Sequence, residues 1–195
     1  TLTKNSLSQY SSCTTIKIQS SSAVSIESQA FWSFIKIESM TIDVQTINFN
    51  QQSFMQQSQF KALKVTADTI NVNTNSFQSA AVESIEFKAT TKILISLQGF
   101  QSLMKVSTLT LNCDGTIEIG ENAFQSSFVK IININAGGDV SIGLQSFQSC
   151  DYITNLVIES KNAGITFAQS SFLDSTLGEV SLTAKNDIIL GQSSM

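Results

Sequence analysis

Few side chains in this sequence are of the types that carry out acid–base, metal or phosphate chemistry. The 195 residues include no His, and all 11 basic residues are Lys. His is the commonest general base and metal ligand. The sequence also lacks Arg, whose guanidinium group can donate two hydrogen bonds at once to a phosphate or a carboxylate. Carboxylates such as Asp43, Glu86 and Glu159 are widely separated in sequence and show no pairing. We therefore predict that the protein is not an enzyme and has no catalytic, cofactor-binding or metal-binding residues.

Charge and hydropathy exclude two classes of partner. The net charge is −4 and 13% of the residues are charged, whereas a nucleic-acid-binding protein would carry a basic face. No apolar run approaches about 18 residues, the length that a membrane-spanning helix needs. The composition thus predicts no nucleic-acid partner and no membrane insertion in this segment.

An internal repeat of about 23 residues indicates the elements that position all other side chains. A Phe recurs at steps of 23 to 25 residues, and a small residue precedes it each time. These anchor residues are Phe31, Phe54, Phe77, Phe100, Phe124, Phe147 and Phe172. The same register reaches Leu7 at one end and Met195 at the other. A fixed period of this length is typical of solenoid proteins.

Two apolar patterns recur in register with the anchors. The pattern L-x-x-L-x-L, in which any apolar residue stands for L, occurs eight times, as in Val129-Ile132-Ile134. An apolar pair with a spacing of two precedes each anchor, as in Ile117/Ile119. Spacings of two and β-branched residues favour strands, and no stretch shows a sustained helical period. We predict an all-β solenoid of about eight 23-residue units, with parallel sheets and little helix.

The array has no recognisable capping unit at either end of the sequence. One 23-residue unit cannot bury its apolar side alone, so each unit must be covered by its neighbours. Consensus residues nevertheless occupy the first and last units, as Ile16 and Leu190 do. We therefore expect residues 1–195 to be a single repeat array that is a segment of a longer array or is stacked in a larger assembly.

Three cysteines fall in or beside the apolar columns. Cys13, Cys113 and Cys150 are expected to pack as small core residues. Cys13 and Cys113 lie four units apart, which is roughly 20 Å at about 4.8 Å per unit. Cys113 and Cys150 are nearly two units apart, again beyond the reach of about 7 Å between Cα atoms. Free thiols are therefore predicted, with no zinc site.

The outward positions of the main strand form the candidate partner-binding face. They lie between the last two apolar columns and are Lys17, Thr41, Lys64, Glu86, Thr110, Asn133, Val157 and Ser181. Simple solvation is the alternative interpretation of this column. Trp32 and Met55 follow their anchors at a position that is Gln in four other units, and they form a candidate lateral patch.

An amide column precedes the anchors by two residues. It includes Gln29, Gln52, Asn75, Gln98 and Asn122. Stacked side-chain amides can bond along the axis of a repeating structure. We therefore expect this column to form a structural ladder.

The segment from Ile117 to Asn135 resembles the BspA-like (Treponema pallidum-type) leucine-rich repeat. Ile119-Gly120 with Ala123-Phe124 matches the family pattern I-G-x-x-A-F, and Cys150 falls at the family cysteine position. The family Pro after the main strand is absent throughout. The resemblance covers essentially the whole chain. It implies that the all-β fold is a right-handed leucine-rich-repeat solenoid of about eight 23-residue units, with parallel sheets and little helix. It also implies a non-enzymatic surface or secreted protein that serves in adhesion and protein–protein contact.

Two functions therefore stay open. The first is an interaction scaffold that presents its strand face to a protein, either self or other, or to a glycan. The second is a structural subunit of a filament or of an extracellular or cytoskeletal assembly, built by stacking. The resemblance favours the cell surface or the extracellular space, whereas free cysteines and the absence of an N-x-S/T sequon also fit an intracellular protein.

Overall fold

The computed structural model describes residues 1–3, 13–31, 37–54 and 59–194, which form twelve β-strands and no helix. The strands are β1 (Thr15–Ile26), β2 (Ile37–Phe49), β3 (Gln59–Val72), β4 (Ala81–Ile95), β5 (Val106–Cys113), β6 (Thr116–Ile119), β7 (Val129–Ala136), β8 (Val140–Ile142), β9 (Ile153–Ser160), β10 (Ile165–Phe167), β11 (Leu177–Ala184) and β12 (Ile188–Leu190).

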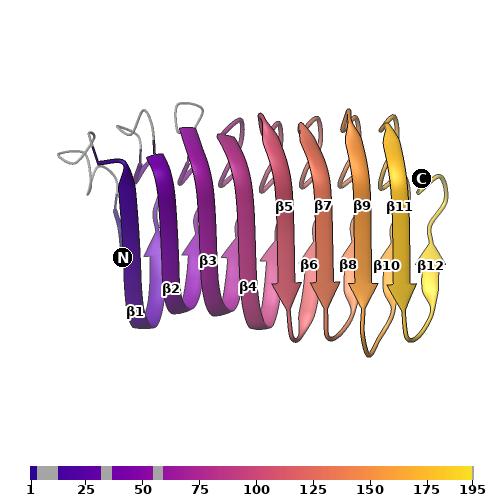
Figure 1. Cartoon of the computed structure of the whole chain (residues 1–195), viewed down its shortest axis with the longest axis horizontal. Coiled ribbons are helices and arrows are strands. Elements are labelled where there is room, and N and C mark those ends of the chain that lie inside the picture. Colours follow the sequence, from indigo (N-terminus) through magenta and orange to yellow (C-terminus); the bar gives the residue numbers. More distant parts are fainter. Residues whose placement is uncertain (4–12, 32–36, 55–58, 195) are drawn as a thin grey trace.

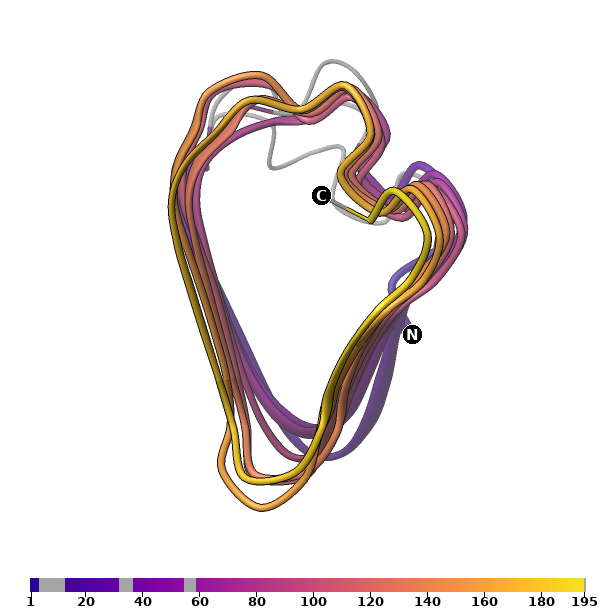
Figure 2. The same cartoon turned by 90° about the vertical axis from the view of Figure 1, so that its right-hand side faces the viewer.

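These strands coil into a parallel solenoid of about 7 turns, with about 23 residues per turn. The main strands β1, β2, β3, β4, β5, β7, β9 and β11 lie side by side along the axis (Figure 1). The second halves of the long N-terminal strands form a second row of paired strands. The shorter strands β6, β8, β10 and β12 extend this row along the axis. Viewed down the axis, successive turns overlie one another around a closed outline (Figure 2). The prediction of an all-β, parallel repeat solenoid is confirmed.

The first four strands are longer than the repeat pattern indicates. β1 to β4 run without interruption from the main sheet into the second side, whereas from β5 onward a bend separates a main strand from a short one. The bends after β5 and β7 contain Gly115 and Gly137, whereas the bend between β11 and β12 has no glycine. A Cβ atom on Gly115 would lie 1.9 Å from the carbonyl oxygen of Thr91 in the preceding turn. Glycine is therefore needed there because two backbones come close together.

A column of stacked phenylalanine rings forms one side of the core. The seven anchor rings are all buried, and neighbouring centroids lie 4.4 to 5.1 Å apart. The L-x-x-L-x-L residues of the inner turns form the opposite side; for example, Ile132 and Ile134 of β7 have no exposed surface. Alternate residues of each strand point inward, so every turn adds one apolar layer to the core.

At the anchors from Phe77 to Phe172, the backbone turns on both sides of the anchor through residues with positive φ. Two positions before the anchors, Gln52, Asn75 and Gln98 have φ of 55°, 55° and 54°. Two positions after the anchors, Ser102 and Ser126 both have φ of 56°. Asn tolerates this left-handed region better than most residues do, and Gln and Ser here are held in it by the rung-to-rung backbone hydrogen bonds. The recurrent amides two residues before the anchors thus occupy a turn.

The expected amide ladder lies in other columns. In the predicted column, the Oδ1 atoms of Asn75 and Asn122 are buried and accept no hydrogen bond, so the prediction was wrong for these residues. Hydrogen-bonded amides instead follow the anchors by one residue. Gln78 donates to Gln101, Gln101 to Gln125, and Gln125 to Gln148 in series along the axis, over N–O distances of 2.9 to 3.0 Å.

The three cysteines are free, as the sequence predicted. Cys113 and Cys150 are buried and Cys13 is half-buried. The Cys150 thiol donates to the backbone oxygen of Phe124, one turn earlier, over 3.0 Å. The Ser127 hydroxyl makes the equivalent bond to Phe100 over 2.8 Å. Cys150 therefore serves the stack as a small hydrogen-bonding core residue, and burial raises the pKa of its thiol to about 12.

Candidate interaction surface

The eight outward residues predicted for partner binding lie in one column across the main sheet. Their strands are paired in an uninterrupted parallel register. The column reads Lys17, Thr41, Lys64, Glu86, Thr110, Asn133, Val157 and Ser181. All of them are half-buried or exposed, while their inward neighbours are buried in the inner turns. We call this surface the main-strand face.

Charge is concentrated in the N-terminal half of the main-strand face. The Lys64 ammonium lies 3.0 Å from a carboxylate oxygen of Glu86 on the neighbouring strand. Lys61 and Glu38 form a second ion pair on β3 and β2, and the hydrogen bond that Lys61 donates to Glu38 raises the pKa of Lys61. Exposed pairs of this kind contribute little to stability, so they mainly set the charge pattern that a partner would meet.

A groove lies where the central main strands end. It has a volume of about 640 Å³ and is lined by Glu86, Lys88, Asn112, Cys113, Asp114, Asn135, Ala136, Gly137, Lys161 and Asn162. In its floor, Asn135 donates a side-chain hydrogen bond to Asn112 over 2.9 Å. Lys88 of β4 and Lys161, which follows β9, come from the strands that flank this amide pair. The groove thus offers amide donors and acceptors between two ammonium groups.

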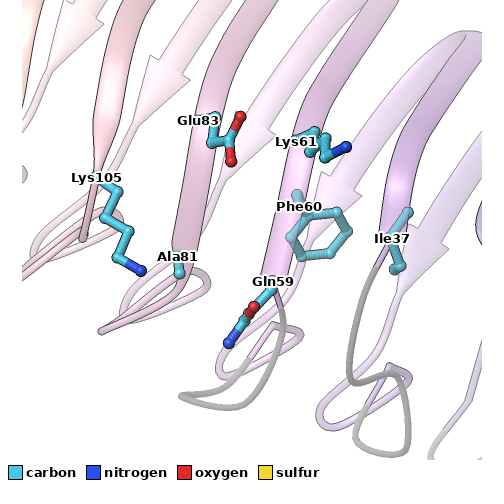
Figure 3. Close-up of a pocket in the computed structure, with 7 residues that line it drawn as sticks. All are labelled: Ile37, Gln59, Phe60, Lys61, Ala81, Glu83 and Lys105. Atoms are coloured by element: carbon cyan, nitrogen blue, oxygen red, sulfur yellow. The ribbon is translucent and has the colours of Figure 1, made fainter.

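A smaller pocket lies at the opposite edge, where the main strands begin (Figure 3). It has a volume of about 70 Å³ and is lined by Ile37, Gln59, Phe60, Lys61, Ala81, Glu83 and Lys105. Its size admits little more than water molecules. Residues 32–36 and 55–58, which adjoin it in the sequence, lie outside the described part of the chain. We call this side of the solenoid the strand-start edge.

The predicted lateral patch cannot be placed, because Trp32 and Met55 fall outside the described residues. Their column is known from later turns, where it carries the ladder of glutamine amides. The column therefore lies at the surface and is partly buried. The patch itself stays a prediction.

Sequence reasoning missed an exposed aromatic pair on the strand-start edge. Phe128 and Tyr152 come directly before β7 and β9, and they are 36% and 63% exposed. Their ring centroids lie 5.8 Å apart at an angle of 44°. Both residues directly precede the first apolar column of their repeat, a position that is not aromatic in the other units, and this substitution was the available signal.

Metal and membrane sites were also sought among residues 1–3, 13–31, 37–54 and 59–194. This part of the chain contains no group of three or more Cys, Asp or Glu side chains that could hold a metal ion. It also contains no helix with the length and apolarity needed to span a membrane.

The comparisons with known proteins agree with the repeat geometry. The model of the BspA type leucine-rich repeat region matches residues 1–96 and 71–193, with six copies. No curated protein and no solved structure matches the chain. Repeats of this type typically mediate binding and are generally non-catalytic.

Proposed function

Because the chain belongs to the BspA-type leucine-rich repeat family, we propose that it is a non-enzymatic scaffold that binds another protein through its main-strand face. The groove at the ends of the central main strands carries this proposal. It is large enough to take a segment of a partner chain, and ligand sites of about 300–1,000 Å³ are usual.

The chemistry of the groove suits a peptide segment. Amide side chains such as Asn112 and Asn135 can bond to the backbone N–H and C=O groups of a partner. Lys88 and Lys161 would attract carboxylates. Of the two carboxylates in the lining, Glu86 is already paired with Lys64, and Asp114 adds a second negative group. Hydrogen bonding of this kind holds an extended segment in place, while the flanking charges select among partners. We infer that the partner contributes an extended segment with acidic side chains, as an adhesive role at the cell surface would allow.

Site-specific photo-crosslinking tests this proposal. A benzophenone amino acid is placed at Asn133 on the main-strand face, or at the exposed Thr166 on β10 of the other side. Partner proteins should be captured from the cell surface at Asn133 and not at Thr166. Binding of the purified captured partner should then fall at least tenfold in Asn135→Arg and stay within twofold in Thr166→Arg. Equal losses in both variants, or capture at Thr166 alone, would refute the assignment of the face.

We propose as a second candidate function that solenoids stack end to end in an assembly. The last described turn exposes apolar side chains whose counterparts in the preceding turn are buried. Ile188 and Leu190 are 40% and 55% exposed, whereas Ile165 and Phe167 are 0% and 1% exposed. β11 and β12 also have one unpaired edge each in the described structure. Such an edge is a template for another turn of the same repeat, from the same chain or from a second copy.

Sedimentation velocity over a wide concentration range tests the stacking of copies. Concentration-dependent association should occur and should be lost in Leu190→Lys, which places a charge in the apolar layer. Ile189→Lys is the matched control, because Ile189 lies outside the inward columns of β12. A monodisperse monomer at high concentration would contradict stacking between copies.

A further inference from the structure

The aromatic side chains of this protein are distributed very unevenly between core and surface. Among the described residues, Phe128 and Tyr152 are the two exposed aromatic side chains, and they contact each other. Every other described Phe is at most 2% exposed. Exposed apolar side chains elsewhere are aliphatic, such as Leu97 and Leu144. An exposed aromatic pair in a chain whose other described aromatic rings are buried calls for a ligand.

The turns that lead into the main strands present this pair. Phe128 and Tyr152 are the residues directly before β7 and β9, two strands that are paired in parallel. Tyr152 has a φ of 71°, and Lys105, which directly precedes β5, has a φ of 67°, so this backbone conformation recurs in the repeat. The side chains and not the backbone therefore distinguish this position, where the Tyr152 ring lies exposed beside Phe128.

The groups around the pair are hydrophilic. The Lys130 ammonium lies 5.9 Å from the centroid of the Phe128 ring, and Asp151 directly precedes Tyr152 and is exposed. Met104 lies one turn earlier on the same edge and is 43% exposed, so it adds one more apolar side chain along the axis. The apolar area is therefore small, whereas a standard protein interface needs about 800 Å² from each partner. Two ring faces with hydroxyl-binding groups beside them suit a smaller repeating ligand.

We propose that Phe128 and Tyr152 form a stacking platform for the pyranose rings of a glycan. The face of an aromatic ring is negative and attracts the C–H groups that line one side of a sugar ring. Lys130 would donate hydrogen bonds to sugar hydroxyls or carboxylates, and Asp151 would accept hydrogen bonds from hydroxyls. The site lies at the strand-start edge, so it is separate from the groove where the main strands end. A protein partner and a glycan could thus be bound at the same time.

A glycan array that includes neutral and uronic-acid-containing oligosaccharides tests the platform. The wild-type chain is compared with Tyr152→Asn, because Asn tolerates positive φ and so removes the ring with little change to the backbone. Phe128→Leu keeps an apolar side chain but removes the second ring face. Both variants should bind at least tenfold more weakly to the glycans that the wild type binds. Tyr152→Phe should stay within threefold, because it keeps the ring.

The control is Leu97→Ala, which removes an equally exposed apolar side chain away from the pair and should leave glycan binding within twofold. Thermal unfolding of each variant checks that the fold is intact. The proposal is overturned if no arrayed glycan distinguishes the wild type from Tyr152→Asn. It is also overturned if the aromatic variants weaken the binding of a protein or peptide and not of a glycan. Neither result would affect the main-strand face, whose test uses other residues and a protein partner.

Discussion

The rings of Phe124 and Phe147 lie 4.9 Å apart and only 3° from parallel, although 23 residues separate them in the chain. This separation is close to the spacing of adjacent β-strands, about 4.8 Å. Strand pairing and ring stacking therefore impose the same distance, and each turn satisfies both. Phe124 contacts Phe100 on its other side at 5.1 Å, so its ring is enclosed by two others.

Replacing Phe124 by Ala should remove this central ring from the stack. The side chain is fully buried, and Phe→Ala changes in cores cost about 3–5 kcal/mol through lost burial and a residual cavity. Urea unfolding followed by far-ultraviolet circular dichroism gives the free energy of unfolding. Phe124→Leu is the matched control and should lose less, because it leaves a smaller void. Equal losses in the two variants would contradict the close packing of the ring.

Gln125→Ala should interrupt the glutamine ladder. Gln125 accepts a hydrogen bond from Gln101 and donates one to Gln148, each over 2.9 Å. Net contributions of about 0.5–1.5 kcal/mol per hydrogen bond predict a loss of about 1–2 kcal/mol, more than at an ordinary surface site. A double-mutant cycle with Gln148→Ala should show coupling between the two side chains. Additive losses would indicate that the ladder is not a stabilising network.

Gly137→Ala and Gly138→Ala should differ strongly although the residues are adjacent. A Cβ atom on Gly137 would lie 1.9 Å from the backbone oxygen of Asp114, which cannot move without disturbing the neighbouring turn. A Cβ atom on Gly138 would come no closer than 3.2 Å to any such atom. Gly137→Ala should therefore cost about 3 kcal/mol by overpacking, and Gly138→Ala should cost less than about 1 kcal/mol. Measuring the free energy of unfolding of both variants under the same conditions tests this difference, and equal losses would contradict it.

Cys150→Ser should be tolerated and should change how stability depends on pH. Ser127 and Ser175 make the equivalent hydrogen bonds in neighbouring turns, so the hydroxyl fits this column. Burial raises the pKa of the Cys150 thiol from 9.0 to about 12, so the folded protein keeps this proton after the unfolded chain has released it. The free energy of unfolding should thus fall as the pH rises from about 9 towards 12. This decrease should be smaller in Cys150→Ser.

Unfolding at pH 8 and pH 10 measures the difference between the two proteins. The effects of titratable groups that both proteins share cancel in that difference. The same fall in stability in wild type and variant would show that Cys150 does not contribute to it. The native thiols should also differ in reactivity, with half-buried Cys13 labelled before buried Cys150.

The sequence was sufficient to predict the core, because packing there depends on side-chain type and period. The anchors such as Phe100 and the inward strand residues such as Ile132 recur in fixed columns, and both are buried. The continuity of the N-terminal strands was not predicted, since it depends on the shape of the backbone at one corner, and corner shape carries no apolar period. The glutamine ladder was assigned to the wrong column, because an amide at Asn75 serves a left-handed turn as readily as a ladder.

The surface was harder to predict for a different physical reason. The column from Lys17 to Ser181 was placed correctly in register, but a strand period says which side chains point outward and not what they bind. The groove depends on how the bends after β5, β7 and β9 are shaped, and bend shape carries no simple period. Phe128 and Tyr152 were overlooked because they lie outside the recurring apolar columns, and a repeat period says nothing about the side chain at such a position.

The constant step between turns has a consequence for how such a protein changes in length. Each turn bonds to the turn before it and the turn after it, through the same columns of strand, ring and amide. A whole repeat could therefore be duplicated or deleted as a block, with its neighbours rejoining in register. The main-strand face would become longer or shorter by one row of side chains, and the groove and the aromatic pair could move apart or together while each kept its own chemistry.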